Sequence, residues 1–406
     1  MSAPSTETKP RPAPLGPDQL HMLAFRRFRS LVDVELQLRS RFTVLIGANG
    51  AGKSSVLDGA YLLSRMLVPV DGEARHTGGP AGLVFRGDWG PRVLTTHDHK
   101  SVGLGIAMVT EAAAIWLTSK WPGPEIQYGL EHAPKWQSWK EPSHGPGDTV
   151  YLKKLRWEPI AKLGACVRLR LDARRARKPS YSEDERPVVQ ADGSGLATAL
   201  SWLSGNDRGA LQAIEHDLNE VVPGTGALKI PRVKLSHWEE KLLRVDDEYI
   251  PQRTKRDVAA DTVEVEFREA GFLPISQLSE GTVLALTLLT VLHSPSCPRL
   301  LLLDDIDQAL HPTAQEELVA CIRRILDQKP ELQIIATSHA PYLLDCLQPE
   351  EVQVLALDEK GHTHVRSLAE HPKAEDLRQG ALYVSELWSA LGEAWVLDER
   401  EEPAAQ

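Results

Sequence analysis

The stretch Gly47-Ala-Asn-Gly-Ala-Gly-Lys-Ser54 decides the fold of this chain. It matches the pattern G-x-x-x-x-G-K-[ST] at every fixed position. The apolar run Phe42 to Ile46 precedes it and is typical of a buried central strand. From Lys53 to Met66 apolar residues recur at helical spacing, so a helix is predicted to follow. A strand, a Gly-rich loop and a helix in this order indicate a phosphate-binding loop.

The chemistry of this loop points to a nucleoside triphosphate. Glycines allow the backbone to pass close to phosphate oxygens, and the helix N-terminus adds partial positive charge. Lys53 is predicted to reach the β- and γ-phosphates, and the Ser54 hydroxyl is predicted to bind Mg2+. The guanine-reading motif Asn-Lys-x-Asp is absent from the sequence, which favours ATP. The predicted nucleotide-binding residues of the loop are Asn49, Gly50, Ala51, Gly52, Lys53, Ser54 and Ser55.

Two adjacent carboxylates end another apolar strand. In Leu300-Leu-Leu-Leu-Asp-Asp305 the apolar run leads directly into Asp304 and Asp305. Asp304 is predicted to hold the Mg2+ shell through water, and Asp305 to orient or deprotonate the water that attacks the γ-phosphate. A further strand is predicted at Leu332 to Thr337, with a helix between the two strands. Such a βαβ unit requires a parallel sheet, so the predicted fold class is α/β.

Composition limits the partners that this chain can have. Its 406 residues carry a net charge of −10, so contact with a nucleic acid would require a local basic patch. The densest basic stretch, Arg168 to Lys178, is predicted either to contact a DNA backbone or to form a solvated strand edge. The longest apolar run, Val283 to Leu292 with two Thr, has about half the length of a membrane span, and the four cysteines lie far apart. These features predict a cytoplasmic protein without a membrane partner.

Changes in composition and periodicity divide the chain into parts. The first residues are rich in Pro, Ser and Thr, and later segments alternate between strand-like and helix-like spacing. The predicted parts are a disordered tail (1–18), an ATPase head (19–360) and a C-terminal segment (361–406), the head comprising a nucleotide-binding core (19–66 and 270–360), an antiparallel β region (67–190) and a helical or lid insertion (191–260).

Two more segments follow the phosphate loop in the sequence: Leu278-Ser-Glu-Gly-Thr282 and Ile334-Ile-Ala-Thr-Ser-His-Ala-Pro341. With them the chain resembles the ABC-type ATPases of the group that contains the RecF, SMC and OLD proteins. It is most similar in pattern to AAA family ATPases with Leu-His-Pro after the carboxylates, here Leu310-His-Pro312. The resemblance covers residues 19–66 and 270–360. It implies an ABC-type P-loop head with a mixed or parallel core sheet, an antiparallel β subdomain and a helical insertion.

The resemblance also implies a composite site shared by two protomers of a homodimer or a higher homo-oligomer. Ser279 and Gly281 of one protomer would close over the γ-phosphate held by Lys53 of the other. His339 would contact the γ-phosphate as a switch histidine, and Lys53, Asp305 and His339 would together carry the catalysis. From the residues alone, Ser-Glu-Gly-Thr is also an ordinary helix start with Ser279 as the N-cap.

One position departs from the family pattern. Asp305 stands where the family usually has glutamate, so its side chain is one methylene shorter. A misplacement of about 1 Å can cost roughly 100-fold in rate, and we therefore expect slow hydrolysis. Asp307 is a nearby carboxylate that could substitute for Asp305.

Three functions are compatible with these motifs. The resemblance implies first an ATPase that acts as sensor or regulator of a separate effector, a nuclease or a toxin, in bacterial antiphage defence. The second function is a RecF-like clamp for DNA repair, which would touch DNA through Arg168 to Lys178. The third is an ATP-dependent scaffold with negligible turnover. Many relatives carry a C-terminal Toprim nuclease, but fewer than seventy residues follow His339, so no fused nuclease is expected.

Overall fold

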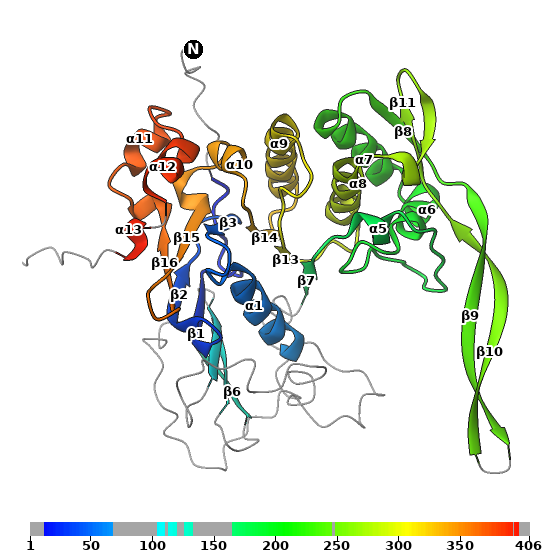
Figure 1. Cartoon of the computed structure of the whole chain (residues 1–406), viewed down its shortest axis with the longest axis horizontal. Helices are drawn as coiled ribbons and strands as arrows, with labels where there is room; N and C mark the ends of the chain where they lie inside the picture. The colour runs from blue at the N-terminus through cyan, green and yellow to red at the C-terminus, as the bar shows by residue number, and fades with distance from the viewer. Residues whose placement is uncertain are drawn as a thin grey trace, which may run out of the picture. The chain divides into compact units, whose positions relative to one another are not determined.

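The computed structural model describes residues 12–67, 104–109, 113–119, 126–132, 165–245, 248–392 and 394–397 (Figure 1). The chain divides into two compact units. Unit 1 contains the chain up to Arg168, residues 298–307 and the chain from Ile322 onwards, whereas unit 2 contains residues 169–297 and 308–321. The segment 298–307, which holds both predicted carboxylates, is therefore connected to unit 2 at each of its ends.

A six-stranded sheet carries the phosphate loop in unit 1. Its strand order is β16-β15-β3-β14-β13-β7, and the loop leaves the end of β3. β14 pairs in parallel with both β3 and β13, β15 pairs in parallel with β3, and β16 is antiparallel to β15. The predicted mixed α/β core is confirmed. The strands are β3 (Phe42–Gly47), β7 (Cys166–Leu169), β13 (Leu300–Leu303), β14 (Gln333–Thr337), β15 (Val352–Leu357) and β16 (Thr363–Ser367).

The parallel pairing brings the motifs of three segments to one edge of this sheet. Every residue of β3, β13 and β14 is buried, as expected for central strands that read as continuous apolar runs. The phosphate loop follows β3, Asp304 and Asp305 follow β13, and His339 follows β14. Because parallel strands end on the same side, these residues gather at the carboxyl edge, where ligands bind in open α/β sheets.

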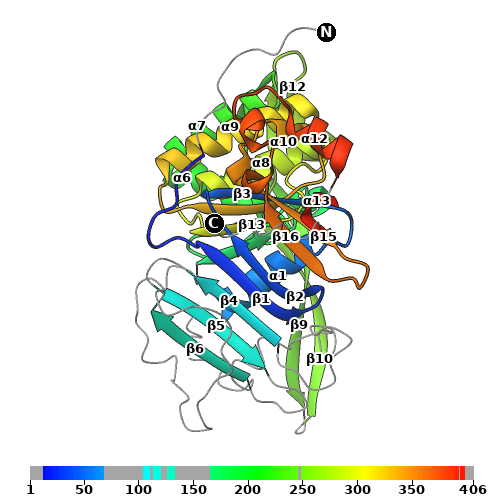
Figure 2. The ribbon, with the colours of Figure 1, turned by 90° about the vertical axis from the view of Figure 1, so that its left-hand side faces the viewer.

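A second sheet of unit 1 is antiparallel and has the order β2-β1-β4-β5-β6 (Figure 2). The alternation of Leu104, Ile106 and Met108 predicts an antiparallel strand, and β4 has this pairing on both of its sides. The strands are β1 (Met22–Phe28), β2 (Leu31–Gln37), β4 (Leu104–Val109), β5 (Ala113–Ser119) and β6 (Ile126–His132).

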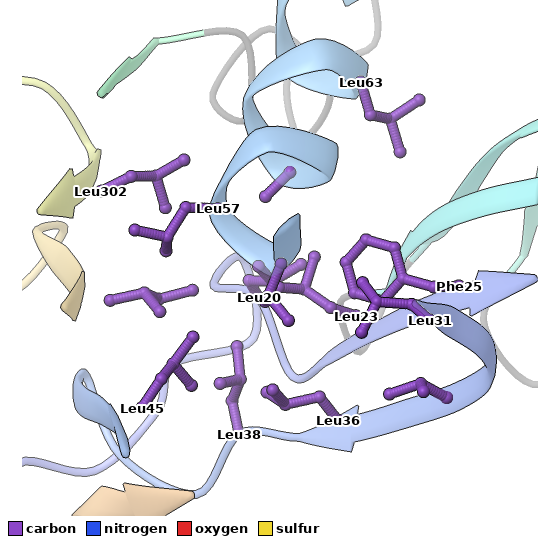
Figure 3. Close-up of a cluster of buried hydrophobic side chains, with 14 of the residues drawn as sticks. Leu20, Leu23, Phe25, Leu31, Leu36, Leu38, Leu45, Leu57, Leu63 and Leu302 are labelled. Carbon is purple, nitrogen blue, oxygen red and sulfur yellow. The ribbon is translucent and has the colours of Figure 1, made fainter. Parts of the chain in front are cut away.

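Helix α1 (Lys53–Leu67) contacts strands of both sheets. Its apolar residues recur at helical spacing, and Leu57 and Leu63 enter a cluster with Phe25 of β1 and Leu302 of β13 (Figure 3). All four side chains are buried. The apolar face of α1 therefore fixes the helix between the sheets, and with it the position of the loop at its N-terminus.

Unit 2 is built around the buried helix α8 (Glu280–His293). Helices α5, α6 and α7 pack on α8, and its interior threonines donate their hydroxyls within the helix, Thr287 to the Val283 carbonyl and Thr290 to the Leu286 carbonyl. Its remaining elements are α5 (Ala173–Ala176), α6 (Leu196–Asn206), α7 (Arg208–Val221), a sheet of β8 (Thr225–Lys229), β11 (Glu264–Phe267) and β12 (Gly271–Pro274), and the hairpin of β9 (Arg232–Val245) and β10 (Glu248–Asp261).

The other helices connect or follow the strands of the core sheet. They are α9 (Pro312–Gln328), in the crossover from β13 to β14, and α10 (Pro341–Asp345), α11 (Ala374–Arg378), α12 (Val384–Leu391) and α13 (Ala394–Leu397). Within the described residues, no helix combines the length and the hydropathy that a bilayer span requires.

The structure corrects several predicted boundaries. The insertion predicted as helical over 191–260 contains α6 and α7 but continues as β8, β9 and β10, because Val233 and Leu235 alternate with polar residues, which is strand spacing. β7, predicted in the antiparallel region, and β16, predicted in the C-terminal segment, both belong to the core sheet. Local alternation of residues identifies a strand but does not reveal which strand it pairs with.

The predicted disordered tail is also too long. The Ala13 carbonyl accepts hydrogen bonds from the Arg41 N–H (2.9 Å) and the Ser40 hydroxyl (3.1 Å), and the Pro14 carbonyl accepts one from Arg41 Nε (3.0 Å). These bonds hold residues 13 and 14 against the start of β3. Residues 1–11 of the predicted tail lie outside the described residues.

Candidate functional site

The phosphate loop begins with a glycine that no residue with a side chain could replace. Gly47 has φ 149°, and a Cβ atom there would lie 2.2 Å from the Leu355 carbonyl oxygen of β15. The loop therefore passes directly against the neighbouring strand. Lys53 is 6% exposed, and its Nζ donates to the carbonyls of Gly47 (2.7 Å) and Ala48 (3.0 Å), so the ammonium lies across the loop.

The remaining loop residues divide by exposure. Asn49, Gly50 and Ser54 are exposed, Ser55 is half-buried, and Ala51 and Gly52 are buried. Thr363 of β16 supports the buried side, because its hydroxyl lies 3.0 Å from the Ala51 carbonyl and 2.8 Å from Ser30 Oγ. Thr363 is 312 residues from Ala51 in sequence, and no local signal predicts this support.

Asp305 has an unusual backbone conformation. Its φ is 50°, in the left-handed region, where Asp and Asn are the non-glycine residues that occur most readily. Its N–H donates to Thr337 Oγ1 (2.9 Å), and that hydroxyl lies 3.3 Å from Asp305 Oδ1. The carboxylate is 54% exposed. Thr337, at the end of β14, therefore fixes both the backbone and the side chain of Asp305.

His339 lies beside the same carboxylate. Its Nε2 is 3.9 Å from Asp305 Oδ1, and its backbone N–H donates to Asp307 Oδ1 (3.3 Å). The imidazole is 43% exposed. The structure thus brings together Asp305, Asp307, His339 and Thr337. Thr337 was missed at the sequence level, although its place at the end of the strand next to β13 would have indicated it.

A row of alternating charges lies behind Asp304. Arg168 of β7 donates from Nη2 to Asp304 Oδ2 (2.6 Å) and from Nη1 to Asp58 Oδ1 on α1. The other oxygen of Asp58 accepts from Arg29, and burial lowers the pKa of the Arg29 guanidinium. The order is Arg29, Asp58, Arg168 and Asp304, and we call these four residues the charge row.

The basic stretch predicted to contact DNA is therefore not a single surface. Arg168 points into unit 1, and Arg177 donates to the Leu278 carbonyl in unit 2 (2.7 Å). The alternation of a strand places residues on two faces but does not say which face is covered, and here the charged residue Arg168 is half-buried. The exposed members of the stretch are Arg170, Arg174, Arg175 and Lys178.

Ser279 and Gly281 lie at the start of α8 in unit 2. Ser279 is the N-cap, since its hydroxyl accepts from the Thr282 N–H (3.2 Å) and lies 2.7 Å from Thr282 Oγ1. Ser279 and Glu280 are exposed, whereas Gly281 is buried. A Cβ atom on Gly281 would lie 2.3 Å from the Ala309 carbonyl oxygen. The structure therefore requires glycine at 281 for packing, apart from any role toward a nucleotide.

We expect Gly281→Ala to destabilise the protein by about 1–3 kcal/mol, because the added methyl overlaps backbone rather than a flexible side chain. Urea unfolding followed by circular dichroism measures this change. Gly205→Ala on α6 is the matched control, since a Cβ atom there would have no neighbour within 4 Å and helix propensity favours alanine. Equal stability of the two variants would contradict the packing role.

The donor set at the sheet edge fits a magnesium nucleotide. Ser54 offers a hydroxyl at the N-terminus of α1, and Asp304 offers a carboxylate. Both groups supply the oxygen ligands that Mg2+ prefers. The close approach at Gly47 gives the loop the shape that surrounds phosphate, and Lys53 supplies the cation. The arrangement is suited to binding a polyphosphate and to directing a water at its terminal phosphorus.

Comparison with known proteins identifies a family. The sequence model described as "AAA domain, putative AbiEii toxin, Type IV TA system" matches residues 42–345. Two curated relatives match shorter segments. The Septu protein PtuA of Bacillus thuringiensis is 38% identical over 69 residues, 17% of each chain. The DNA replication and repair protein RecF of Geobacter sulfurreducens is 49% identical over 47 residues, 12% of this chain and 13% of that protein. The aligned segments thus span less than a fifth of either relative.

Two solved structures are similar over most of their length. The SMC head domain from Thermotoga maritima is 13% identical, with 86% of this chain and 98% of that chain covered and a TM-score of 0.44. The Smc head domain from Pyrococcus furiosus, with an extended coiled coil and bound to the C-terminal domain of ScpA, is 14% identical. It covers 93% of this chain and 99% of that chain, with a TM-score of 0.47.

Proposed function

Because the chain belongs to this AAA-domain family and is an ABC-type ATPase of the RecF and SMC group, we propose that it binds and slowly hydrolyses Mg·ATP to control a separate effector protein. The single observation that supports this best is the gathering of the phosphate loop, Asp304, Asp305 and His339 at one sheet edge.

The proposed reaction is in-line attack of water on the γ-phosphate. Asp305 accepts the water's proton or orients the water, and Thr337 keeps the carboxylate in place. Lys53 and the loop N–H groups stabilise the charge that develops on the phosphate oxygens, and His339 contacts the γ-phosphate from beside Asp305. Mg2+, when held by Ser54 and Asp304, neutralises phosphate charge. The rate is expected to be slow, because the Asp305 side chain is short and bonded back to Thr337.

Dimerisation around ATP is part of the proposal. Ser279 is exposed at the N-terminus of the long helix α8, where N–H groups and the helix dipole favour an anion. In a homodimer, Ser279 and Gly281 of each protomer would close the site that Lys53 forms in the other. ATP would then stabilise the closed dimer, and hydrolysis would release it.

The proposed biological setting is antiphage defence. The family description names a toxin of a toxin–antitoxin system, and one relative is a Septu protein. We therefore propose that a nuclease or toxin on a separate polypeptide is the effector, and that the population of the closed dimer controls it.

The Asp305→Asn variant tests this function. With Mg·ATP it should hold the closed state, so light scattering should report twice the protomer mass, and a nuclease or toxin should co-purify from the native host. The double variant Asp305→Asn/Lys53→Ala is the control and should remain monomeric. A variant that stays monomeric at saturating ATP would overturn the composite site.

A second candidate is a RecF-like DNA clamp, favoured by the RecF match and by the exposed side chains of Arg170, Arg174, Arg175 and Lys178. In that case the Asp305→Asn dimer would carry DNA and no effector, and neutralising these four residues would remove DNA-stimulated hydrolysis. A third outcome, ATP-dependent assembly of the unmodified protein with undetectable hydrolysis, would identify a scaffold.

A further inference from the structure

The charge row places one guanidinium between two carboxylates, next to the proposed magnesium site. Arg168 uses Nη1 for Asp58 and Nη2 for Asp304, and it is 17% exposed. Its Nε is buried without a hydrogen-bond partner, so the two carboxylates are the polar groups that hold this side chain among the described residues. Leaving Nε without a partner costs free energy, and the ion pairs with both Asp58 and Asp304 are needed to offset that cost.

Asp304 is left with one oxygen for another ligand. Its side chain is 6% exposed, and Oδ2 accepts from Arg168. In the described part of the chain, no hydrogen bond or ion pair is seen at Oδ1. Arg168 therefore fixes the rotation of the carboxylate and leaves Oδ1 available to the Mg2+ shell.

The same geometry makes Arg168 a competitor for cations. Its guanidinium is paired with Asp304, the carboxylate proposed to serve Mg2+, and the positive charge of an arginine at this position repels Mg2+ through a partly desolvated medium. ATP would change this balance, because its phosphates would bring several negative charges to the site.

We propose that Arg168 is a positioning residue that makes cation binding at Asp304 depend on nucleotide. It orients Asp304 through Oδ2 and, by its charge, keeps free divalent cations out until phosphates arrive. Asp58 sets the strength of this effect, because it shares Arg168 and is in turn neutralised by Arg29. The inference rests on the proposed magnesium nucleotide site and adds to it the group that regulates metal affinity.

The proposal predicts opposite effects for two substitutions. Arg168→Met removes the charge and leaves Asp58 and Asp304 as an acidic pair, so free cations should bind more tightly. Asp58→Asn keeps a hydrogen-bond acceptor but leaves the charge of Arg168 less neutralised, so cations should bind more weakly. If Arg168 only supported the fold, both substitutions would change the cation affinity in the same direction.

The test measures Mn2+ binding to the full chain by electron paramagnetic resonance without nucleotide, and the Mg2+ dependence of binding of a fluorescent ATP analogue. We expect Arg168→Met to tighten Mn2+ binding by about tenfold or more, and Asp58→Asn to raise the Mg2+ concentration for half-maximal nucleotide binding by about threefold or more. Arg170→Met is the matched control, being an exposed arginine two residues away. Adding Asp304→Asn to Arg168→Met should abolish the gain.

Unchanged Mn2+ binding in Arg168→Met would overturn the proposal, as would a shift of both variants in one direction. If Arg168→Met does not fold, the Mg2+ dependence of nucleotide binding in Asp58→Asn tests the proposal alone, and an unchanged or lower half-maximal Mg2+ concentration overturns it. Failure of the unmodified protein to bind the ATP analogue would instead refute the proposed function, and the Mn2+ measurement without nucleotide would still test Arg168.

Discussion

Replacement of Lys53 by alanine is expected to lower kcat for ATP hydrolysis by about 100- to 1,000-fold, the size of effect seen when one charge-stabilising donor is removed from an active site. Lys53 is buried, and its ammonium already lies across the loop through the carbonyls of Gly47 and Ala48. Its charge is therefore positioned before a nucleotide binds and needs little reorganisation. Alanine removes that charge, and the loop N–H groups cannot replace it.

Phosphate release at saturating Mg·ATP measures the change, with nucleotide affinity determined separately by calorimetry. Lys178→Ala is the control, because this lysine is exposed and lies in unit 2. A Lys53→Ala protein that folds and hydrolyses ATP within a few-fold of the unmodified rate would refute the site.

The second large effect is expected from Asp305→Glu, and it is a gain. The side chain of glutamate is one methylene longer, so its carboxylate would extend beyond the contact that Asp305 Oδ1 makes with Thr337 Oγ1. This should correct a misplacement of about 1 Å and raise kcat by up to about 100-fold. The gain has a structural cost. Asp305 has φ 50°, and glutamate lacks the short polar side chain that tolerates this conformation, so stability should fall by about 1 kcal/mol.

Single-turnover hydrolysis and urea unfolding measure the two effects. Asp307→Glu is the matched control, since the side chain of Asp307 accepts the His339 N–H instead of contacting Thr337. If Asp305→Glu is no faster and Asp307→Asn abolishes hydrolysis, then Asp307 rather than Asp305 acts on the water.

The parts of the site that lie in one continuous segment could be predicted from the sequence. Gly47 to Ser54 carries strand, loop and helix in a single window, and Asp304 directly follows its own buried strand. The order of these segments also predicts that they meet, because parallel strands of a βαβ unit end at the same edge.

The parts that depend on distant segments could not be predicted. Arg168 is 110 residues from Asp58 and 136 from Asp304, and within its own segment it reads as one of several basic residues. Thr363 and Ser30 are 333 residues apart. The left-handed conformation of Asp305 has no local pattern either, although it offers a physical reason for aspartate at this position.

The register of β3 with β14 has a consequence for synthesis of the protein. Phe42 pairs with Ile334, so the first of the two strands that pair with β3 is made almost three hundred residues later, and the second, β15, is made later still. At ribosomal speeds of about 5–20 residues per second, the nascent loop waits roughly 15–60 s for that partner. Throughout this interval the apolar β3 exposes an unpaired edge, and such edges aggregate. We therefore expect that nascent chains need protection by a chaperone, and that the last-made part of the ATPase core decides when the first-made motif acquires its shape.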